Sequence, residues 1–122
     1  MMIGHVDRNL DAVLTLTAID SSENHHEIVA VVDTGYNGTL MLPTVKIAEM
    51  RLSWTASVSA TLADGSTKKF DVFNGTIRWH GNPRSVEIDA SNGCALIGMS
   101  LLEGDELRAK IIPGGMLTIT SD

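Results

Sequence analysis

The sequence is poor in cysteine, in aromatic residues and in basic residues. Its single cysteine, Cys94, cannot form a disulfide within the chain, which favours a reducing compartment, and we expect a cytoplasmic location. Aromatic residues make up 4% of the chain, so aliphatic side chains must build the core. Nine basic against fifteen acidic residues give a net charge of -6. We therefore expect neither nucleic acid nor an anionic membrane as a partner, since both require clustered Lys and Arg.

Long apolar segments are missing as well. The longest unbroken apolar run, Ile28–Val32, is far shorter than the roughly 20 residues that a membrane-spanning helix needs. The first residues, MMIGHVDRNL, do not place an apolar stretch behind a basic head, so we expect no secretory signal. A length of 122 residues, 43% of them hydrophobic, predicts one domain with a single core.

Alternating apolar residues and frequent turn residues predict a mainly β chain. The run at 27–32 is almost continuously apolar, which is typical of a strand buried on both faces. Asp64-Gly65 between two alternating segments is a strong hairpin signal. We expect a short helix at 43–52, opened by Pro43, and one helical turn at 99–103. The expected strands are 12–18, 27–32, 57–62, 67–73, 76–79, 85–88, 107–112 and 116–120, and an apolar segment at 95–98 ends at a glycine.

One segment, VVDTGYNG at 31–38, departs from this pattern of strands and turns. It places an ionisable residue, Asp33, at the end of the most apolar predicted strand. Burying a carboxylate costs several kcal/mol unless the group is paired or neutralised. The simplest interpretation is that Asp33 begins a turn, since Asp, Asn and Gly are common turn residues. The tripeptide Asp33-Thr34-Gly35 alone does not decide between a turn and a functional site.

Three motifs taken together resemble the retropepsin-like aspartic proteases of clan AA, and the bacterial members in particular. The first is Val31-Val32-Asp33-Thr34-Gly35 with the apolar residues 40–42 behind it, and the second, about 60 residues later, is Leu96-Ile97-Gly98. Between them, residues 62–66 are similar to the tip of the hairpin flap of this family. The resemblance implies a mainly β fold, the retropepsin-like closed β-barrel (acid protease fold) with one or two short helices. Residues 1–122 would form a single retropepsin-like aspartic protease domain.

The resemblance also implies an activity, that of an aspartic endopeptidase acting on a peptide or an unfolded protein. A water molecule held between two aspartates attacks the peptide bond. One carboxylate is the general base, and the other, protonated, polarises the scissile carbonyl. Two carboxylates about 3 Å apart repel by roughly 5 kcal/mol at an effective dielectric constant near 20, so the pair retains one shared proton over a wide pH range. The mechanism requires no metal and no cofactor.

The chain contains one Asp-Thr-Gly sequence, whereas two-lobed relatives carry two copies, so the resemblance implies a homodimer in which the two Asp33 carboxylates meet across a two-fold axis. In such a dimer Thr34 would brace the two loops, and the Gly35 amide would donate to the carboxylate. The residues implied to bind substrate are Tyr36, Asn37, Leu96, Ile97 and Gly98 in the cleft, and Ala63, Asp64 and Gly65 in the flap that excludes water.

Three departures from the family pattern leave alternatives open. Tyr36 stands where many retropepsins have a small residue, and Asn37 where viral relatives often have an aspartate. The Pro113-Gly114-Gly115 hairpin could replace, or add to, the interleaved terminal strands of the usual dimer. One alternative is therefore a catalytically inactive module of the same fold that binds a peptide or protein. Another is an unrelated small β-barrel with a chance tripeptide.

Other candidate sites have little support in the sequence. His25 and His26 are adjacent, and adjacent side chains of an extended segment point apart, so we expect a solvated loop and no metal site. Cys94 has no basic neighbour to activate a thiolate. No Gly-x-Ser-x-Gly elbow of a serine hydrolase is present.

Overall fold

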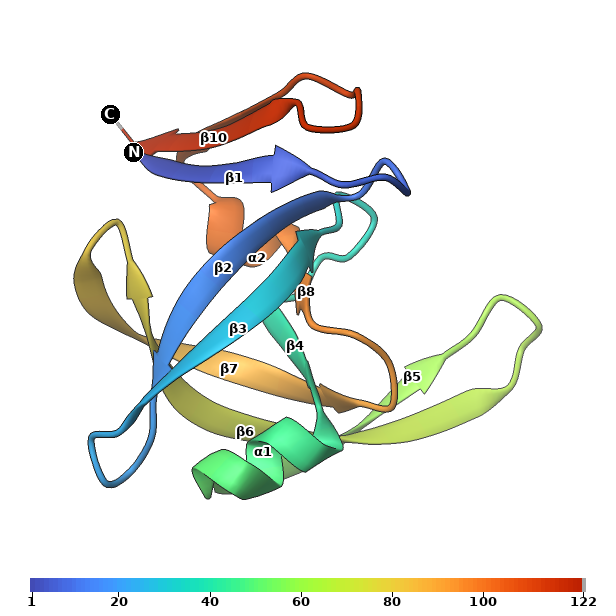
Figure 1. Ribbon diagram of the computed structural model, residues 1–122. Helices are drawn as coiled ribbons and strands as arrows, with labels where there is room; N and C mark the ends of the chain where they lie inside the picture. The colour runs from blue at the N-terminus through green and yellow to red at the C-terminus, as the bar shows by residue number, and fades with distance from the viewer. Residues whose placement is uncertain (122) are drawn as a thin grey trace.

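The computed structural model of the chain describes residues 1–121, and within them the protein is mainly β, as predicted (Figure 1). The elements are β1 (Met2–Val6), β2 (Ala12–Ile19), β3 (His25–Val32), β4 (Leu40–Pro43), α1 (Thr44–Met50), β5 (Ser53–Thr61), β6 (Thr67–Trp79), β7 (Asn82–Ser91), β8 (Leu96–Ile97), α2 (Met99–Leu102), β9 (Asp105–Ala109) and β10 (Met116–Ser121).

Six of the strands close into a barrel. They are neighbours in the order β6-β7-β4-β8-β3-β2, and β2 pairs with β6 at Ala18↔Ile77 and Ile19↔Thr76 to complete the ring. The short strand β8 lies between β3, to which it is parallel, and β4, to which it is antiparallel. The predicted fold class, a closed mainly β barrel with two short helices, is confirmed.

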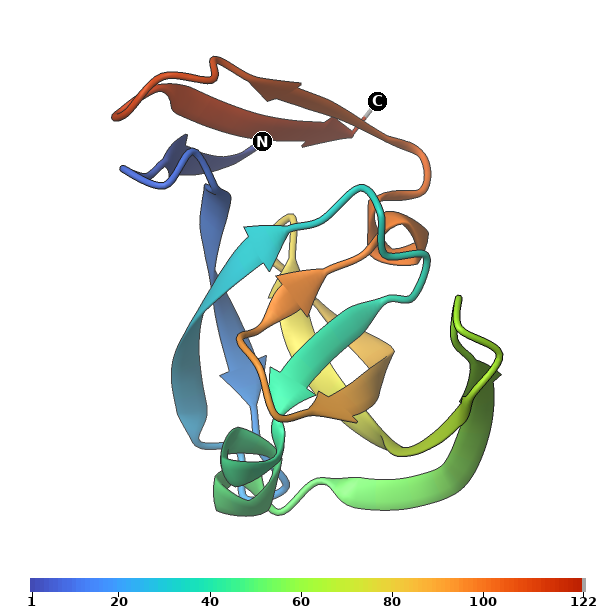
Figure 2. The same ribbon diagram turned by 90° about the vertical axis from the view of Figure 1, so that its right-hand side faces the viewer.

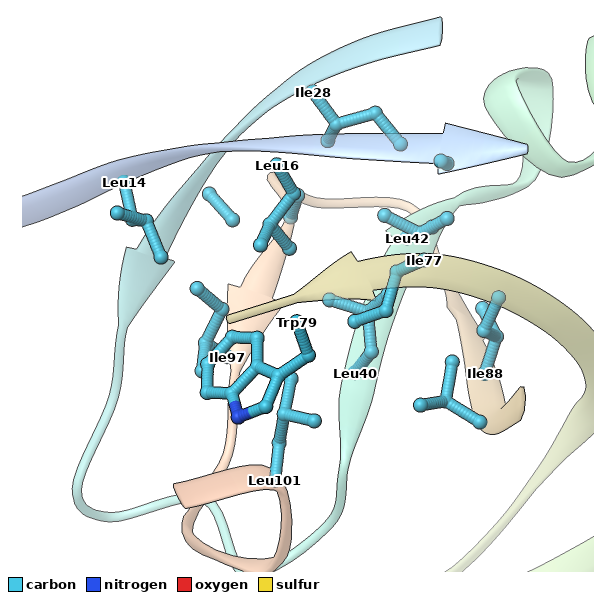
Figure 3. Packing of buried hydrophobic residues seen from close by; sticks show 14 of the residues in the cluster. Leu14, Leu16, Ile28, Leu40, Leu42, Ile77, Trp79, Ile88, Ile97 and Leu101 are labelled. Carbon is cyan, nitrogen blue, oxygen red and sulfur yellow. The ribbon is translucent and has the colours of Figure 1, made fainter. Parts of the chain in front are cut away.

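Aliphatic side chains fill the barrel, as the shortage of aromatic residues predicts (Figure 3). Leu16, Leu40, Ile77 and Ile97 come from four different strands, and none is more than 1% exposed. Trp79 adds an aromatic ring to the same cluster. Burying one Leu or Ile side chain contributes about 1.5–3 kcal/mol relative to leaving it exposed, so these strands are held together chiefly by the core.

The expected strands 12–18 and 27–32 lie in β2 and β3, which form an antiparallel hairpin paired from Ile19↔His25 to Val13↔Val31. Side chains alternate along β3, so that Ile28 and Ala30 are buried while Val29 is 65% exposed. The prediction that this strand is buried on both faces is therefore wrong. β-branched residues favour strands whether or not they face the core, and here one face of the antiparallel pair meets solvent.

The Asp64-Gly65 turn joins β5 to β6, as predicted, but β6 continues to Trp79 where two strands, 67–73 and 76–79, are expected. Gly75 lies inside the strand instead of in a turn. A Cβ atom at Gly75 would lie 2.5 Å from the Ile88 side chain, so the glycine permits close packing on β7. The β5–β6 hairpin projects from the barrel (Figure 2).

The two helices lie where the sequence predicts them. α1 follows Pro43 and ends at Arg51, which takes the left-handed conformation with φ 52° and donates its amide to the Ala48 carbonyl. α2 occupies the predicted turn after Gly98 and buries Leu101 and Leu102. Neither helix, in the part of the chain that the structure describes, is long and apolar enough to span a membrane.

The terminal strands form a small sheet beside the barrel. β1, which the sequence signals do not predict, pairs with β10, and β10 pairs with β9. The predicted hairpin around Pro113-Gly114-Gly115 is present, but its first strand is β9 at 105–109 and not 107–112. A Cβ atom at Gly115 would lie 1.9 Å from the Lys110 carbonyl oxygen, so glycine permits the close approach of the two chain segments at this turn. β10 thus occupies the place beside β1 within the same chain.

Candidate active site

Asp33 lies directly after β3, beside β8. Its amide donates to the Ile97 carbonyl at 2.9 Å, and Val31 and Val32 pair with Leu96 and Ile97 in the parallel β3–β8 ladder. The fold thus brings together the two motifs that the sequence separates by about 60 residues. The two-residue strand β8 lies between β3 and β4, and its pairing with β3 holds the Asp33 loop against the barrel.

The Asp33 carboxylate is held by its own loop. Asp33 Oδ1 accepts the Gly35 amide at 2.9 Å, and the Asp33 carbonyl accepts the Tyr36 amide at 3.1 Å. A Cβ atom at residue 35 would lie 3.2 Å from Oδ1, so glycine suits this approach. The carboxylate is partly exposed and Thr34 is exposed, so both can be reached from outside this chain.

The start of α2 fastens the rest of the loop. The Met99 and Ser100 amides donate to the carbonyls of Tyr36 at 2.8 Å and Gly38 at 3.1 Å. The Ser100 hydroxyl donates to the Asn37 carbonyl. Gly98 is buried in this contact, and a Cβ atom there would lie 2.0 Å from the Gly38 carbonyl oxygen. Gly98 therefore serves the packing of the loop, while the Asn37 side chain is exposed.

The Tyr36 ring is half-buried, and its hydroxyl donates to Oδ2 of Asp89 on β7. Burial, and next the hydrogen bond to the Asp89 carboxylate, raise the pKa of the Tyr36 phenol well above its usual range. The phenol therefore stays protonated and acts as a donor across physiological pH. It ties the Asp33 loop to the wall of the barrel.

A cleft of about 260 Å³ opens beside Tyr36, between the loop and the β5–β6 hairpin. Its walls combine apolar side chains with one base and one acid, and they are formed by Tyr36, Met41, Ala60, Leu62, Lys68, Phe70, Asp89, Ala90 and Ser91. A smaller hollow of about 160 Å³ shares Lys68, Phe70, Ala90 and Ser91 with it, so the cleft continues along the base of the hairpin. Such an elongated cleft suits an extended chain.

The cleft includes Tyr36, which the sequence predicts, but most of its lining residues are missed. Asp89 is 53 residues from Tyr36, and no local pattern connects them. Phe70 and Lys68 lie at alternate positions of β6 and therefore share one face, which is the signal that could have pointed to them. Leu96, Ile97 and Gly98 lie behind the loop, where Leu96 is partly exposed and the other two are buried.

The predicted flap tip is exposed, and hydrogen bonds within the turn close it. Asp64 Oδ1 accepts the Ser66 hydroxyl at 2.6 Å and the Ser66 amide at 2.9 Å, which lowers the pKa of Asp64. Gly65 takes the positive φ of 86° that this turn requires. Leu62, the residue before Ala63, lines the cleft, so the tip stands at its outer end.

The other candidates take structural positions. The expectation of a solvated loop at His25 and His26 is wrong, because both residues open strand β3 and pair with β2. His25 is exposed, whereas the part-buried His26 imidazole is hydrogen-bonded to Asp20 Oδ2 at 2.8 Å. Within residues 1–121 no three His, Cys, Asp or Glu side chains gather as metal ligands would. Cys94 is exposed in the loop before β8.

A closed barrel with an Asp-Thr-Gly loop at the β3–β8 pairing and a projecting hairpin defines the retropepsin-like fold of aspartic proteases. The chain has this fold. A retropepsin-like aspartic protease from Rickettsia conorii superposes with a TM-score of 0.58 at 16% identity, over 98% of this chain and 89% of that one. Simian foamy virus (mac) protease superposes with a TM-score of 0.53 at 19% identity, over 73% of this chain and 91% of that one. EIAV protease superposes with a TM-score of 0.52 at 16% identity, over 80% of this chain and 92% of that one. No protein-family model matches the sequence, and no curated protein matches it.

Proposed function

We propose that the protein is an aspartic endopeptidase that acts as a homodimer, with Asp33 of each chain in one shared active site. The observation that carries this proposal is the position of Asp33, held by the Gly35 amide at 2.9 Å and fixed to the Ile97 carbonyl, yet partly open to solvent. Asp33 and Thr34 are open to solvent on a loop that is itself fixed to β8 and α2, so a second chain can approach the carboxylate at a defined position. The likeness to aspartic proteases of the same fold supports the assignment.

The chemistry requires a second carboxylate, and the second chain supplies it. One Asp33 takes a proton from the bound water as that water attacks the peptide carbonyl. The other Asp33, protonated, donates to the carbonyl oxygen, on which negative charge develops. As the C–N bond breaks, the proton that the first Asp33 took from the water passes to the leaving amine. A two-fold axis between the loops makes the two carboxylates equivalent before substrate binds.

The substrate is a peptide in extended conformation. The walls of the cleft beside Tyr36 are mainly apolar, and its continuation along the base of the β5–β6 hairpin is more polar. Lys68 and Asp89 stand among these walls and provide polar contacts for the peptide backbone or side chains. The hairpin, with Asp64 and Gly65 at its tip, would cover the peptide and exclude water.

Replacing Asp33 by Asn tests the assignment. Asp33→Asn keeps the size of the side chain and an oxygen that accepts the Gly35 amide, but it removes the general base. We expect the cleavage of mixed unfolded peptides, followed by mass spectrometry between about pH 3 and pH 8, to fall at least a hundredfold. Far-UV circular dichroism should be unchanged.

The exposed Asp11, in the turn before β2, provides the matched control. Asp11→Asn makes the same chemical change away from the cleft and should cleave like the wild type. Equal cleavage by Asp33→Asn and the wild type would exclude the proposed mechanism. A dimeric wild type that binds peptides in the cleft without cutting them would favour the inactive binding module.

A further inference from the structure

The strand β9 leaves one edge of the terminal sheet unpaired in residues 1–121, since it pairs with β10 on its other side. The strand is well fixed at its start. Asp105 accepts hydrogen bonds from Trp79 Nε1 at 3.1 Å and from His80 Nε2 at 3.0 Å. A fixed, open strand edge offers its amides and carbonyls to another strand.

The register of β9 identifies the main-chain groups that point outward. The Lys110 amide donates to the Met116 carbonyl at 3.1 Å, and the pairing of Ala109 with Leu117 continues the same register. Successive residues of an antiparallel strand direct their N–H and C=O groups to opposite edges. The main-chain groups of Asp105, Leu107 and Ala109 are therefore directed to the free edge.

The side chains of β9 follow the sequence Glu106-Leu107-Arg108. Leu107 pairs with the fully buried Ile119 and shares its inner face, yet Leu107 is 36% exposed because no strand lies beyond it. Glu106 and Arg108 point to the other face and are exposed. Neither forms an ion pair within the described residues. An apolar residue between two opposite, unpaired charges is self-complementary under a two-fold rotation.

We propose that β9 pairs antiparallel with β9 of a second copy of this chain, with Leu107 opposite Leu107 at the two-fold axis. The outward N–H and C=O of each Leu107 then bond reciprocally to those of the other. Glu106 of each chain stands opposite Arg108 of its twin, at a position where cross-strand side chains are close. The two Leu107 side chains cover each other and extend the inner apolar face across both chains.

Other registers of the same two strands lack this match. A two-fold axis at Glu106 sets two acids opposite each other, and an axis at Arg108 sets two bases opposite each other. An axis at Ala109 places Arg108 opposite Lys110 of the twin. Like charges directly opposite each other destabilise a strand pair. Among these registers, only the one centred on Leu107 places each Glu106 opposite an Arg108 and is stabilised by both charge pairs.

This interface deepens the proposed function and rests on it, because the active site needs two copies. Only Glu103 and Gly104 separate β9 from α2, and the first residues of α2 donate to the Asp33 loop. The terminal sheet and the loop after β3 lie at the same end of the barrel (Figure 2). In this dimer the hairpin of residues 105–121 contributes the contact that interleaved terminal strands make in other enzymes of this fold.

Charge reversal tests the interface. E106R sets two bases opposite each other in each cross-strand pair, and R108E sets two acids opposite each other. We expect each single variant to raise the Kd of the dimer at least about tenfold, measured by sedimentation equilibrium, with peptide cleavage falling in parallel. Both side chains are exposed, so circular dichroism should show the wild-type fold.

Two rescues make the test specific. The double variant E106R/R108E restores both opposite-charge pairs and should dimerise like the wild type. An equimolar mixture of E106R with R108E should form heterodimers and regain cleavage, because each base then faces an acid. Failure of both rescues, or single variants that dimerise like the wild type, would overturn the interface.

The outcome separates this inference from the proposed function. If the protein cleaves peptides as a dimer and the Kd of that dimer is the same in E106R and R108E as in the wild type, the interface is overturned and the protease assignment stands. A dimer that follows the charge pattern but cuts no peptide would support the interface and count against the protease assignment. A wild type that stays monomeric at high concentration would overturn the interface.

Discussion

At the scale of single residues, the Asp33 loop accommodates the large Tyr36 ring by means of two glycines. A Cβ atom at Gly38 would meet the Tyr36 hydroxyl oxygen and two ring carbons at 2.4 to 2.6 Å, and one at Gly98 would lie 2.7 Å from Tyr36 Cδ2. The ring therefore lies against bare backbone, and its hydroxyl reaches Asp89. Tyr36, which departs from the family pattern, is thus part of a local set that fits together.

Gly98→Ala should disturb this packing. Its methyl group would lie 2.0 Å from the Gly38 carbonyl oxygen, which is main chain and can move only with the loop. We expect a loss of about 1–3 kcal/mol in the free energy of unfolding, measured by urea titration, and a fall in peptide cleavage.

Gly93→Ala is the matched control for this change. A Cβ atom there would meet only the Ser91 hydroxyl at 3.5 Å, which is ordinary van der Waals contact, so its stability should stay within about 0.5 kcal/mol of the wild type. Equal effects of the two substitutions would contradict the packing role of Gly98.

At the scale of elements, Asp20 organises the connection between β2 and β3. Its Oδ1 accepts the amides of Ser22 at 2.9 Å and Asn24 at 2.8 Å, while Oδ2 is bonded to the His26 imidazole at 2.8 Å. The hydrogen bond to His26, followed by those to the two amides, lowers the pKa of Asp20 from 3.8 to about 2 against a smaller opposing effect of desolvation.

The hairpin should therefore lose stability in acid. Because the pKa of Asp20 is lower in the folded chain than in the unfolded chain, its contribution is complete above about pH 4 and is lost as the pH falls towards about 2. Asp20→Asn removes the charge. The difference in melting temperature between the wild type and Asp20→Asn should shrink as the pH is lowered from 5 to 2.

Asp11→Asn, measured over the same pH range, controls for the general effect of acid. This variant keeps Asp20, so its difference in melting temperature from the wild type should not shrink in the same way. A difference in melting temperature between the wild type and Asp20→Asn that stays constant from pH 5 to 2 would contradict the lowered pKa of Asp20.

At the scale of the whole molecule, the barrel closes where β2 meets β6, while the terminal sheet leaves β9 open. One chain contains one Asp33 loop and most of one cleft. The proposed activity would therefore require a pair of chains and would be lost when the pair dissociates.

Cleavage should depend steeply on protein concentration. Below the Kd of the dimer, the concentration of active sites rises as the square of the concentration of chains, and above the Kd it rises linearly. Initial rates on one peptide, measured over a hundredfold dilution series, should change from one regime to the other where sedimentation shows the dimer dissociating. A strictly linear rate from a monomeric protein would contradict the shared active site.

The sequence alone determined the parts of this protein that depend on neighbouring residues. Pro43 opens α1, Asp64-Gly65 makes the tip of the hairpin, and the alternation of apolar residues sets most of the strands. The turn at Asp33 was also predictable, because the Gly35 amide reaches a carboxylate two residues away. The catalytic role of Asp33 was inferred from the resemblance to a family, and it stays a prediction.

Only the tertiary structure decided what depends on residues far apart in the chain. The contact of Tyr36 with Asp89 spans 53 residues, and Gly75 reads locally as a turn although it packs inside β6. β1 becomes a strand because β10 and β2 lie on either side of it. The exposure of two apolar residues was also decided at this level: Val29 lies on the solvent face of the β2–β3 pair, and Leu107 lies on β9, the edge strand of the sheet.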